Sequence, residues 1–140
     1  MSTVLWVNQL LDGVVTSDTQ DKYALSAHLK KLDALCKTQK LVLLSAMCDS
    51  TDLQFNHSDD VLPAGMTSSN ELMAVSGVWA AAADAVTMLA ALHAHIQAAK
   101  PRFGLLRNDY DAVVEELTEA LASARLSAAL GAKFNFSIVG

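Results

Sequence analysis

The hydrophobic pattern at the start of the chain is typical of a β-hairpin. Residues 3–9 are rich in valine, leucine and tryptophan, which favour strands. Asp12 and Gly13 then separate two short apolar runs, and both central residues of a type I′ turn need positive φ. We therefore predict that the chain opens with a hairpin whose turn is formed by Asp12 and Gly13.

A helical pattern follows this hairpin. Four apolar residues recur at helical spacing and form one stripe: Leu25, Leu29, Leu32 and Cys36. Ser17 or Asp18 can cap the start of such a helix, so the pattern predicts one helix over about residues 19–38. The short apolar run 41–44 that comes after it is interpreted as a buried strand.

Residues 46–77 form the least regular part of the sequence. They include Pro63, Gly65 and many Ser, Thr, Asn and Asp residues. A structureless loop of this length is uncommon inside a small domain, so short elements are expected within it. Residues 53–56 alternate and predict a short strand, and residues 71–75 are interpreted as another.

The rest of the chain predicts two helices and a strand. The alanine-rich segment 78–99 is read as a helix that Pro101 stops. The next helix begins after Asn108 or Asp109 and ends at Gly131, a suitable C-cap. Its apolar stripe consists of Val113, Leu117, Leu121, Ala124 and Ala128. Residues 133–139 then alternate as a final strand, with the aromatic side chains on one face.

This order of elements predicts a single α+β domain over residues 1–140. We expect a small mixed or antiparallel sheet made of the N-terminal hairpin, a central strand and the C-terminal strand. About three helices should cover it, which is the usual two-layer solution. Alanine lines nearly every face of the first half of the helix at 78–99, so this helix is expected to be central in the fold or at a homodimer contact.

The amino-acid composition limits the expected binding partners and the expected cellular compartment. Of the 140 residues 52% are hydrophobic and 18% charged, which argues for an extensive core. The net charge of −5 makes nucleic acid and anionic membranes poor partners, so neither is expected. The N-terminus has no basic region before its apolar run, and the two cysteines form no CxxC pair. These features favour a cytoplasmic protein with reduced thiols.

Sequence signatures of catalysis and of cofactor binding are missing. The chain has no glycine-rich phosphate loop, no dinucleotide fingerprint, no HExxH and no GxSxG. His93 and His95 are two apart on a predicted helix and point about 200° away from each other, so they cannot hold one ion together. We therefore assign no catalytic residue, no metal ligand and no cofactor.

One acidic segment stands out as a candidate site. Its polar members are Asp49, Asp52, His57, Asp59 and Asp60. The window from Asp49 to Asp60 has the length of an EF-hand loop, but Gln54 occupies the place of the required glycine. The segment is therefore a solvated loop, a contact surface, or a site for acid–base work by His57 with an aspartate.

The distribution of charge favours a contact surface. Between Lys40 and Lys100 there is no lysine or arginine, whereas the predicted first helix is basic. The opposite charges satisfy each other within the fold or face water, or else the acidic surface attracts a basic partner.

The leading hypothesis is a small non-enzymatic module that binds another protein, in the manner of a regulator or of an immunity protein that neutralises a basic toxin. The alternative is an enzyme or a metal-dependent protein that uses the segment from Asp49 to Asp60. A homodimer is compatible with either. Convergence of Asp49, Asp52 and His57 in one pocket favours chemistry, and divergence over a surface favours binding.

Overall fold

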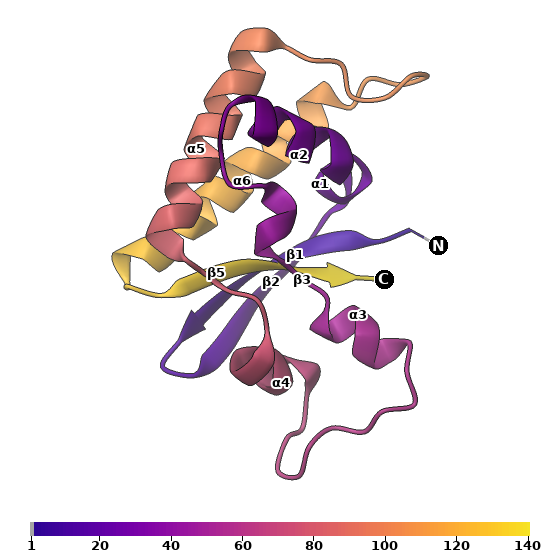
Figure 1. Ribbon diagram of the computed structural model, residues 1–140, viewed down its shortest axis with the longest axis vertical. Helices are drawn as coiled ribbons and strands as arrows, with labels where there is room; N and C mark the ends of the chain where they lie inside the picture. Colours follow the sequence, from indigo (N-terminus) through magenta and orange to yellow (C-terminus); the bar gives the residue numbers. More distant parts are fainter. Residues whose placement is uncertain (1) are drawn as a thin grey trace.

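The sheet is built around the C-terminal strand. The structure is a computed structural model that describes residues 2–140 (Figure 1). Its strands are β1 (Val4–Leu11), β2 (Val14–Lys22), β3 (Cys48–Asp49), β4 (Ala80–Ala81) and β5 (Lys133–Val139). The order is β2-β1-β5-β3, and β4 also pairs with β5. The β3–β5 pair is parallel and the other pairs are antiparallel, so the expected α+β class with a mixed sheet is confirmed.

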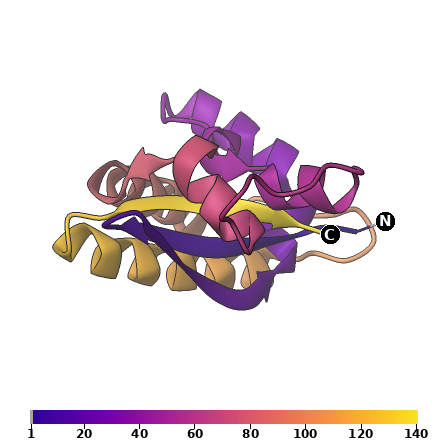
Figure 2. The same ribbon diagram turned by 90° about the horizontal axis from the view of Figure 1, so that it is seen from below.

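Helices cover both faces of this sheet. They are α1 (Tyr23–Ala27), α2 (Leu29–Thr38), α3 (Thr51–Asn56), α4 (Ser69–Ser76), α5 (Ala82–Ala99) and α6 (Tyr110–Ala129), with a short 3-10 helix η1 (Leu44–Met47). The helices α1, α2, α5 and α6 lie on one face, and α3 and α4 lie on the other (Figures 1 and 2). The expected two-layer arrangement is therefore wrong, because the irregular segment supplies a second helical layer.

The first face carries the apolar core. Leu5 and Val7 of β1 and Phe134 and Phe136 of β5 are buried there against the core residues of α5 and α6. The two phenylalanine rings meet edge to face, with their centroids 5.2 Å apart. Burial of these side chains and of the helix stripes is the main stabilising contribution to the fold.

The second face has a buried polar centre formed by Asn8 and Asn135. Asn8 and Asn135 are 1% and 0% exposed. Asn8 Nδ2 donates to Asn135 Oδ1 at 2.9 Å, and Asn135 Nδ2 donates to the carbonyl oxygen of Val78 at 2.8 Å. Met73 of α4 packs over this pair and is buried, whereas α3 has no fully buried residue. Met73 and these hydrogen bonds therefore attach the α3–α4 layer to the sheet.

The N-terminal hairpin has the predicted turn. Asp12 and Gly13 have φ angles of 51° and 76°, and Leu11 faces Val14 across the pair of strands. Both central residues are left-handed, as a type I′ turn requires.

The first helix begins later than predicted. Residues 14–22 pair with β1 along the whole of β2, so the helix starts at Tyr23 rather than near residue 19, and neither Ser17 nor Asp18 caps it. It is also divided at His28, whose ring binds Asp109 from a distant part of the chain. The predicted stripe of Leu25, Leu29, Leu32 and Cys36 does face the core.

Three predicted strands in the middle of the chain are wrong. Residues 41–44 lead into η1, and pairing with β5 occurs only at β3. Residues 53–56 belong to α3, and residues 71–75 belong to α4. The α4 start is a capping arrangement in which the Glu71 amide donates to Ser68 Oγ and the Glu71 carboxylate accepts from the Thr67 amide.

The long helices agree with the sequence pattern apart from one start. The helix predicted over 78–99 begins at Ala82, because Ala80 and Ala81 pair with β5 before it. It packs against α6, but its outer surface, including Ala83, is exposed, so it is not central in the fold. The α6 stripe and the C-terminal strand are confirmed, and Gly131 has a φ of 69°. No helix within residues 2–140 is long and apolar enough to cross a membrane.

Candidate partner-binding site

Asp49 is a structural anchor rather than an open functional group. It lies on β3 and is only 2% exposed. Its Oδ1 accepts from the Thr51 amide at 2.9 Å, and its Oδ2 accepts from the Val78 amide at 2.8 Å. A Cβ at Gly77 would lie 2.9 Å from Asp49 Oδ2, so glycine permits this close approach. The carboxylate thus joins the start of α3 to the chain that leaves α4.

Asp52 has a similar local role. Its Oδ1 accepts from Ser69 Oγ at 2.7 Å, and its Oδ2 accepts from Asn56 Nδ2 at 3.2 Å. These bonds hold α3 against the first residue of α4. Both aspartates therefore shape the α3–α4 layer.

The other three predicted site residues lie on the surface after α3. His57, Asp59 and Asp60 are exposed, and of these only Asp60 lines a hollow. In the part of the chain that the structure describes, His57 forms no ion pair with a carboxylate. Since Asp49 is already occupied, the five predicted residues share a layer but do not converge in one pocket.

The hollow beside Asp60 is the α3–α4 groove. It has a volume of about 500 Å³ and lies between α3, α4 and the loop that joins them. Phe55 and Leu72 are half-buried in it, and Val61 is 88% exposed at its edge. The lining residues are Thr51, Gln54, Phe55, Asp60, Val61, Pro63, Leu72 and Ser76. The groove thus has a mixed lining in which apolar and polar residues are equally represented, and Asp60 is its one acidic member.

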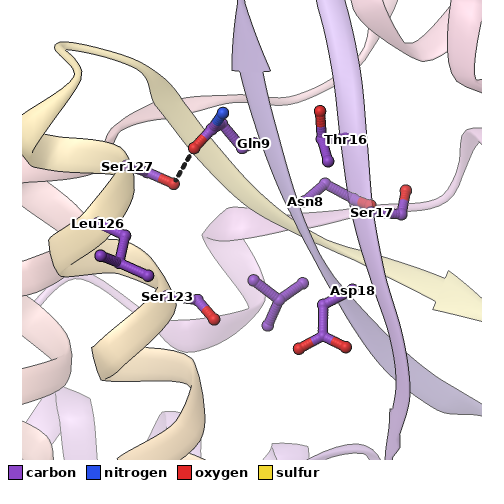
Figure 3. A pocket seen from close by; sticks show the side chains of 9 residues that line it. Asn8, Gln9, Thr16, Ser17, Asp18, Ser123, Leu126 and Ser127 are labelled. Atoms are coloured by element: carbon purple, nitrogen blue, oxygen red, sulfur yellow. Dashed lines mark hydrogen bonds between the residues drawn. The ribbon is translucent and has the colours of Figure 1, made fainter.

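A smaller polar hollow lies between the hairpin and α6. It has a volume of about 200 Å³, and Ser127 Oγ donates across it to Gln9 Oε1 at 2.9 Å (Figure 3). Asp18 is the one ionisable residue in its lining, and its Oδ1 accepts from the Gln20 amide. Its lining consists of Val7, Asn8, Gln9, Thr16, Ser17, Asp18, Ser123, Leu126 and Ser127.

Charged side chains also join the hairpin and α1 to α6. Lys22 is 1% exposed, and its Nζ lies 2.9 Å from Glu119 Oε2. The Glu116 carboxylate accepts from the amides of Ala24 and Leu25, both at 3.1 Å. Burial raises the pKa of Glu116, although these amides and Lys22 act in the opposite direction. No local sequence signal reveals the contacts of Glu116 with Ala24 and Leu25, because these residues are about ninety positions away along the chain.

Neither the cysteines nor the potential metal-binding side chains support a catalytic site. Both thiols are free, and burial raises the pKa of Cys48 to about 12 and also raises that of Cys36. A protonated thiol is a poor nucleophile. Among residues 2–140, no three His, Cys, Asp or Glu side chains lie close enough together to hold a metal ion.

The loop between α5 and α6 carries a feature that the sequence analysis missed. Leu105 and Leu106 are 95% and 102% exposed at its tip. A signal was present, because two adjacent leucines lie between a helix stop at Pro101 and a helix cap at Asn108 or Asp109. Apolar pairs are unusual in so short a connection between helices.

No relative guides the interpretation of these surfaces. Comparisons with protein families, with curated proteins and with solved structures found no match to this chain. A fold by itself also does not determine a function.

Proposed function

We propose that this chain is a non-enzymatic module that binds a basic, partly apolar segment of another protein in the α3–α4 groove. The observation that carries the proposal is the composition of the groove, in which Phe55, Val61 and Leu72 provide apolar surface and Asp60 lies at the edge. Partially exposed apolar pockets with a polar rim are typical anchor sites at protein interfaces.

The charge around the groove supports a basic ligand. The groove lies wholly between Lys40 and Lys100, the interval that has no lysine or arginine. Asp59 is exposed next to Asp60, so the edge carries adjacent negative charges. Such a surface attracts a positive partner and increases its rate of association.

The positions of Asp49 and His57, which the alternative enzyme hypothesis would use, also support binding over chemistry. Both carboxylate oxygens of Asp49 accept backbone amides, and His57 is exposed without a carboxylate partner among residues 2–140. We place the module in the cytoplasm, and its two free cysteines support that location.

The proposal is tested with peptides of defined charge. One set of twelve-residue peptides combines leucine with arginine, and a matched set replaces each arginine with glutamate. Titration is followed by backbone amide NMR of the full chain. We expect the basic set to bind, with shifts concentrated between residues 51 and 76, and the acidic set not to bind. Equal binding of both sets, or shifts concentrated elsewhere, contradicts the proposal.

Two variants and a control show which residues of the groove contribute to peptide binding. Val61→Ser removes an exposed apolar contact without disturbing the fold, and we expect it to weaken binding several-fold, equivalent to about 1 kcal/mol. The double variant D59K/D60K should weaken binding further and reduce its salt dependence. D111K/E115K makes the same change in net charge on exposed residues of α6, and it should leave binding nearly unchanged. Partners captured from the native host by the wild type but not by V61S then identify the natural ligand.

A further inference from the structure

The loop that joins α5 and α6 ends in an apolar tip. Leu105 and Leu106 are 95% and 102% exposed, and the loop projects beyond the end of α5 (Figure 1). Single exposed leucines are common on protein surfaces, but an adjacent pair on a projecting loop forms a small apolar patch. We call residues 104–107 the tip.

The base of this loop holds the tip in one conformation. Phe103 is buried in the core, and its carbonyl oxygen accepts from the Asp109 amide at 2.7 Å. Arg102 Nε and Nη2 donate to the carbonyl oxygens of Gly104 and Leu105 at 2.8 and 2.9 Å. A tip ordered in this way loses little conformational entropy when it docks.

The charge around the tip is positive. Lys100, Arg102 and Arg107 belong to the loop and are exposed, and the Arg107 side chain is 88% exposed although its Nε lies 3.3 Å from Asp109 Oδ1. The tip therefore presents leucines beside arginine. This is the chemistry that the α3–α4 groove favours.

We propose that the tip of one copy docks in the α3–α4 groove of a second copy of this chain. The proposal rests on the same groove as the proposed function and names a ligand for it. Leu105 and Leu106 enter the apolar part of the groove, and Arg107 faces Asp60. Figure 1 shows the tip at the end of the molecule that carries α5 and α6, and α3 and α4 at the opposite end, so a second copy would have to supply the tip. With two-fold symmetry each copy gives its tip and receives that of the other, which closes a dimer.

A second copy fits the tip better than a membrane does. The whole chain has a net charge of −5, which opposes approach to an anionic bilayer. Two leucines offer little apolar surface for membrane anchoring. The groove, by contrast, supplies apolar side chains for the leucines and a carboxylate for the arginine on the same molecule.

The test is the mass of the full chain in solution. Sedimentation over a range of concentrations should show a species of about 30 kDa, twice the 14.9 kDa of one chain. L105S/L106S should lower the association constant about 100-fold or more, with an unchanged melting temperature because both side chains are exposed. R107E and D60K should each weaken association, and the charge-swapped double variant R107E/D60K should recover much of it.

Mixing and control experiments identify the two halves of the contact. A chain with the tip defect L105S/L106S and a chain with the groove defect D59K/D60K should associate when mixed, because together they retain one intact tip and one intact groove. Ala83→Glu changes the exposed face of α5 and should leave the dimer intact. The inference is wrong if the chain stays monomeric, if A83E alone dissociates it, or if the two defective chains do not associate.

Two further experiments distinguish this inference from membrane binding by the tip and from the proposed function. Binding of the wild type to vesicles of phosphatidylcholine with phosphatidylserine, lost in L105S/L106S, would overturn the inference and make the tip a membrane element. The arginine peptides are also titrated into L105S/L106S, whose groove is free. If they bind while the wild type remains monomeric, only the inference fails. If the wild type dimerises through the tip and the peptides do not bind, the proposal of a foreign ligand fails instead.

Discussion

Replacement of Asp49 tests whether its carboxylate has a structural or a functional role. Its two oxygens accept the amides of Thr51 and Val78 in a site that is 2% exposed. Asp49→Ala leaves both part-buried amides without this acceptor, and each lost hydrogen bond to a charged group costs about 1.5–3 kcal/mol. Because the two losses share one site, we expect a total of about 3–5 kcal/mol. Asp49→Asn keeps one acceptor and points a donor at the other amide, so its cost should be about 1–3 kcal/mol.

Urea unfolding measures this loss directly. A single domain has a free energy of unfolding of about 5–15 kcal/mol, so Asp49→Ala should remove a large share of it. With a slope of about 2 kcal/mol per molar urea, a loss of 3–5 kcal/mol lowers the midpoint by about 1.5–2.5 M. The matched control is Asp59→Ala, which is exposed and should change stability by less than about 0.5 kcal/mol.

Hydrogen exchange shows which part of the fold is destabilised by replacement of Asp49. In Asp49→Asn the amides of Thr51 and Val78 should exchange faster than in the wild type, while those in the middle of α6 change little. Equal urea midpoints for Asp49→Ala and Asp59→Ala would refute the structural role. Asp49 would then be a candidate for the chemistry that its sequence neighbours suggest.

Three other predictions follow from local geometry. Gly13→Val forces a β-branched residue to a φ of 76° and should lower the free energy of unfolding by about 1 kcal/mol or more, measured by urea titration against Val14→Thr as a control. Two thiols should titrate after denaturation without reductant, whereas Cys48 in the folded protein should react slowly with iodoacetamide at pH 8, because burial raises its pKa to about 12. Burial raises the pKa of Glu116 from its ordinary 4.5, so its stabilising contribution is complete below the unfolded pKa and is lost as the pH rises through the folded pKa. Glu116→Gln cannot ionise at this position, so its free energy of unfolding minus that of the wild type should increase between about pH 4 and 7 in urea titrations. A difference that stays constant with pH would contradict the raised pKa.

Elements with a strong local signal were predictable from the sequence. The hairpin turn needs two left-handed residues, and the Asp12-Gly13 pair supplies them wherever the strands go. The α6 stripe and its Gly131 cap are likewise properties of one continuous segment. In these cases local preference and tertiary packing agree.

The errors occur where distant contacts decide the structure. Residues 53–56 fit a strand pattern, but Asp49 accepts the Thr51 amide and turns the chain into α3. The division between α1 and α2 at His28 accompanies a hydrogen bond to Asp109, which lies 81 residues away. The strand β3 has only two residues and depends on β5 for its pairing. The cap Ser68 with Glu71 was the one local signal for α4 that sequence reasoning overlooked.

The same difference explains why the candidate site was only partly predictable. The five residues of the acidic segment lie in one region of the fold, but they have unlike roles: Asp49 and Asp52 build the layer, and Asp60 lines the groove. Charge alone does not reveal which carboxylates accept backbone amides. The apolar part of the groove was hidden because Phe55 and Leu72 belong to short helices that were read as strands.

The way the α3–α4 layer is attached has a consequence for binding. The opposite face of the sheet is held by a continuous apolar core, whereas α3 and α4 together bury one residue fully, Met73. Hydrogen bonds of Asp49 and Asn135 also hold the layer to the sheet, and the bond between Ser69 and Asp52 joins α3 to α4. Such bonds fix orientation well, and each contributes about 0.5–1.5 kcal/mol when it is neutral and about 1.5–3 kcal/mol when its acceptor is a charged carboxylate. A layer held in this way can open locally without unfolding the core. The groove can therefore adjust to segments of different shape, and a ligand that bridges α3 and α4 gains affinity at the cost of ordering the layer that receives it.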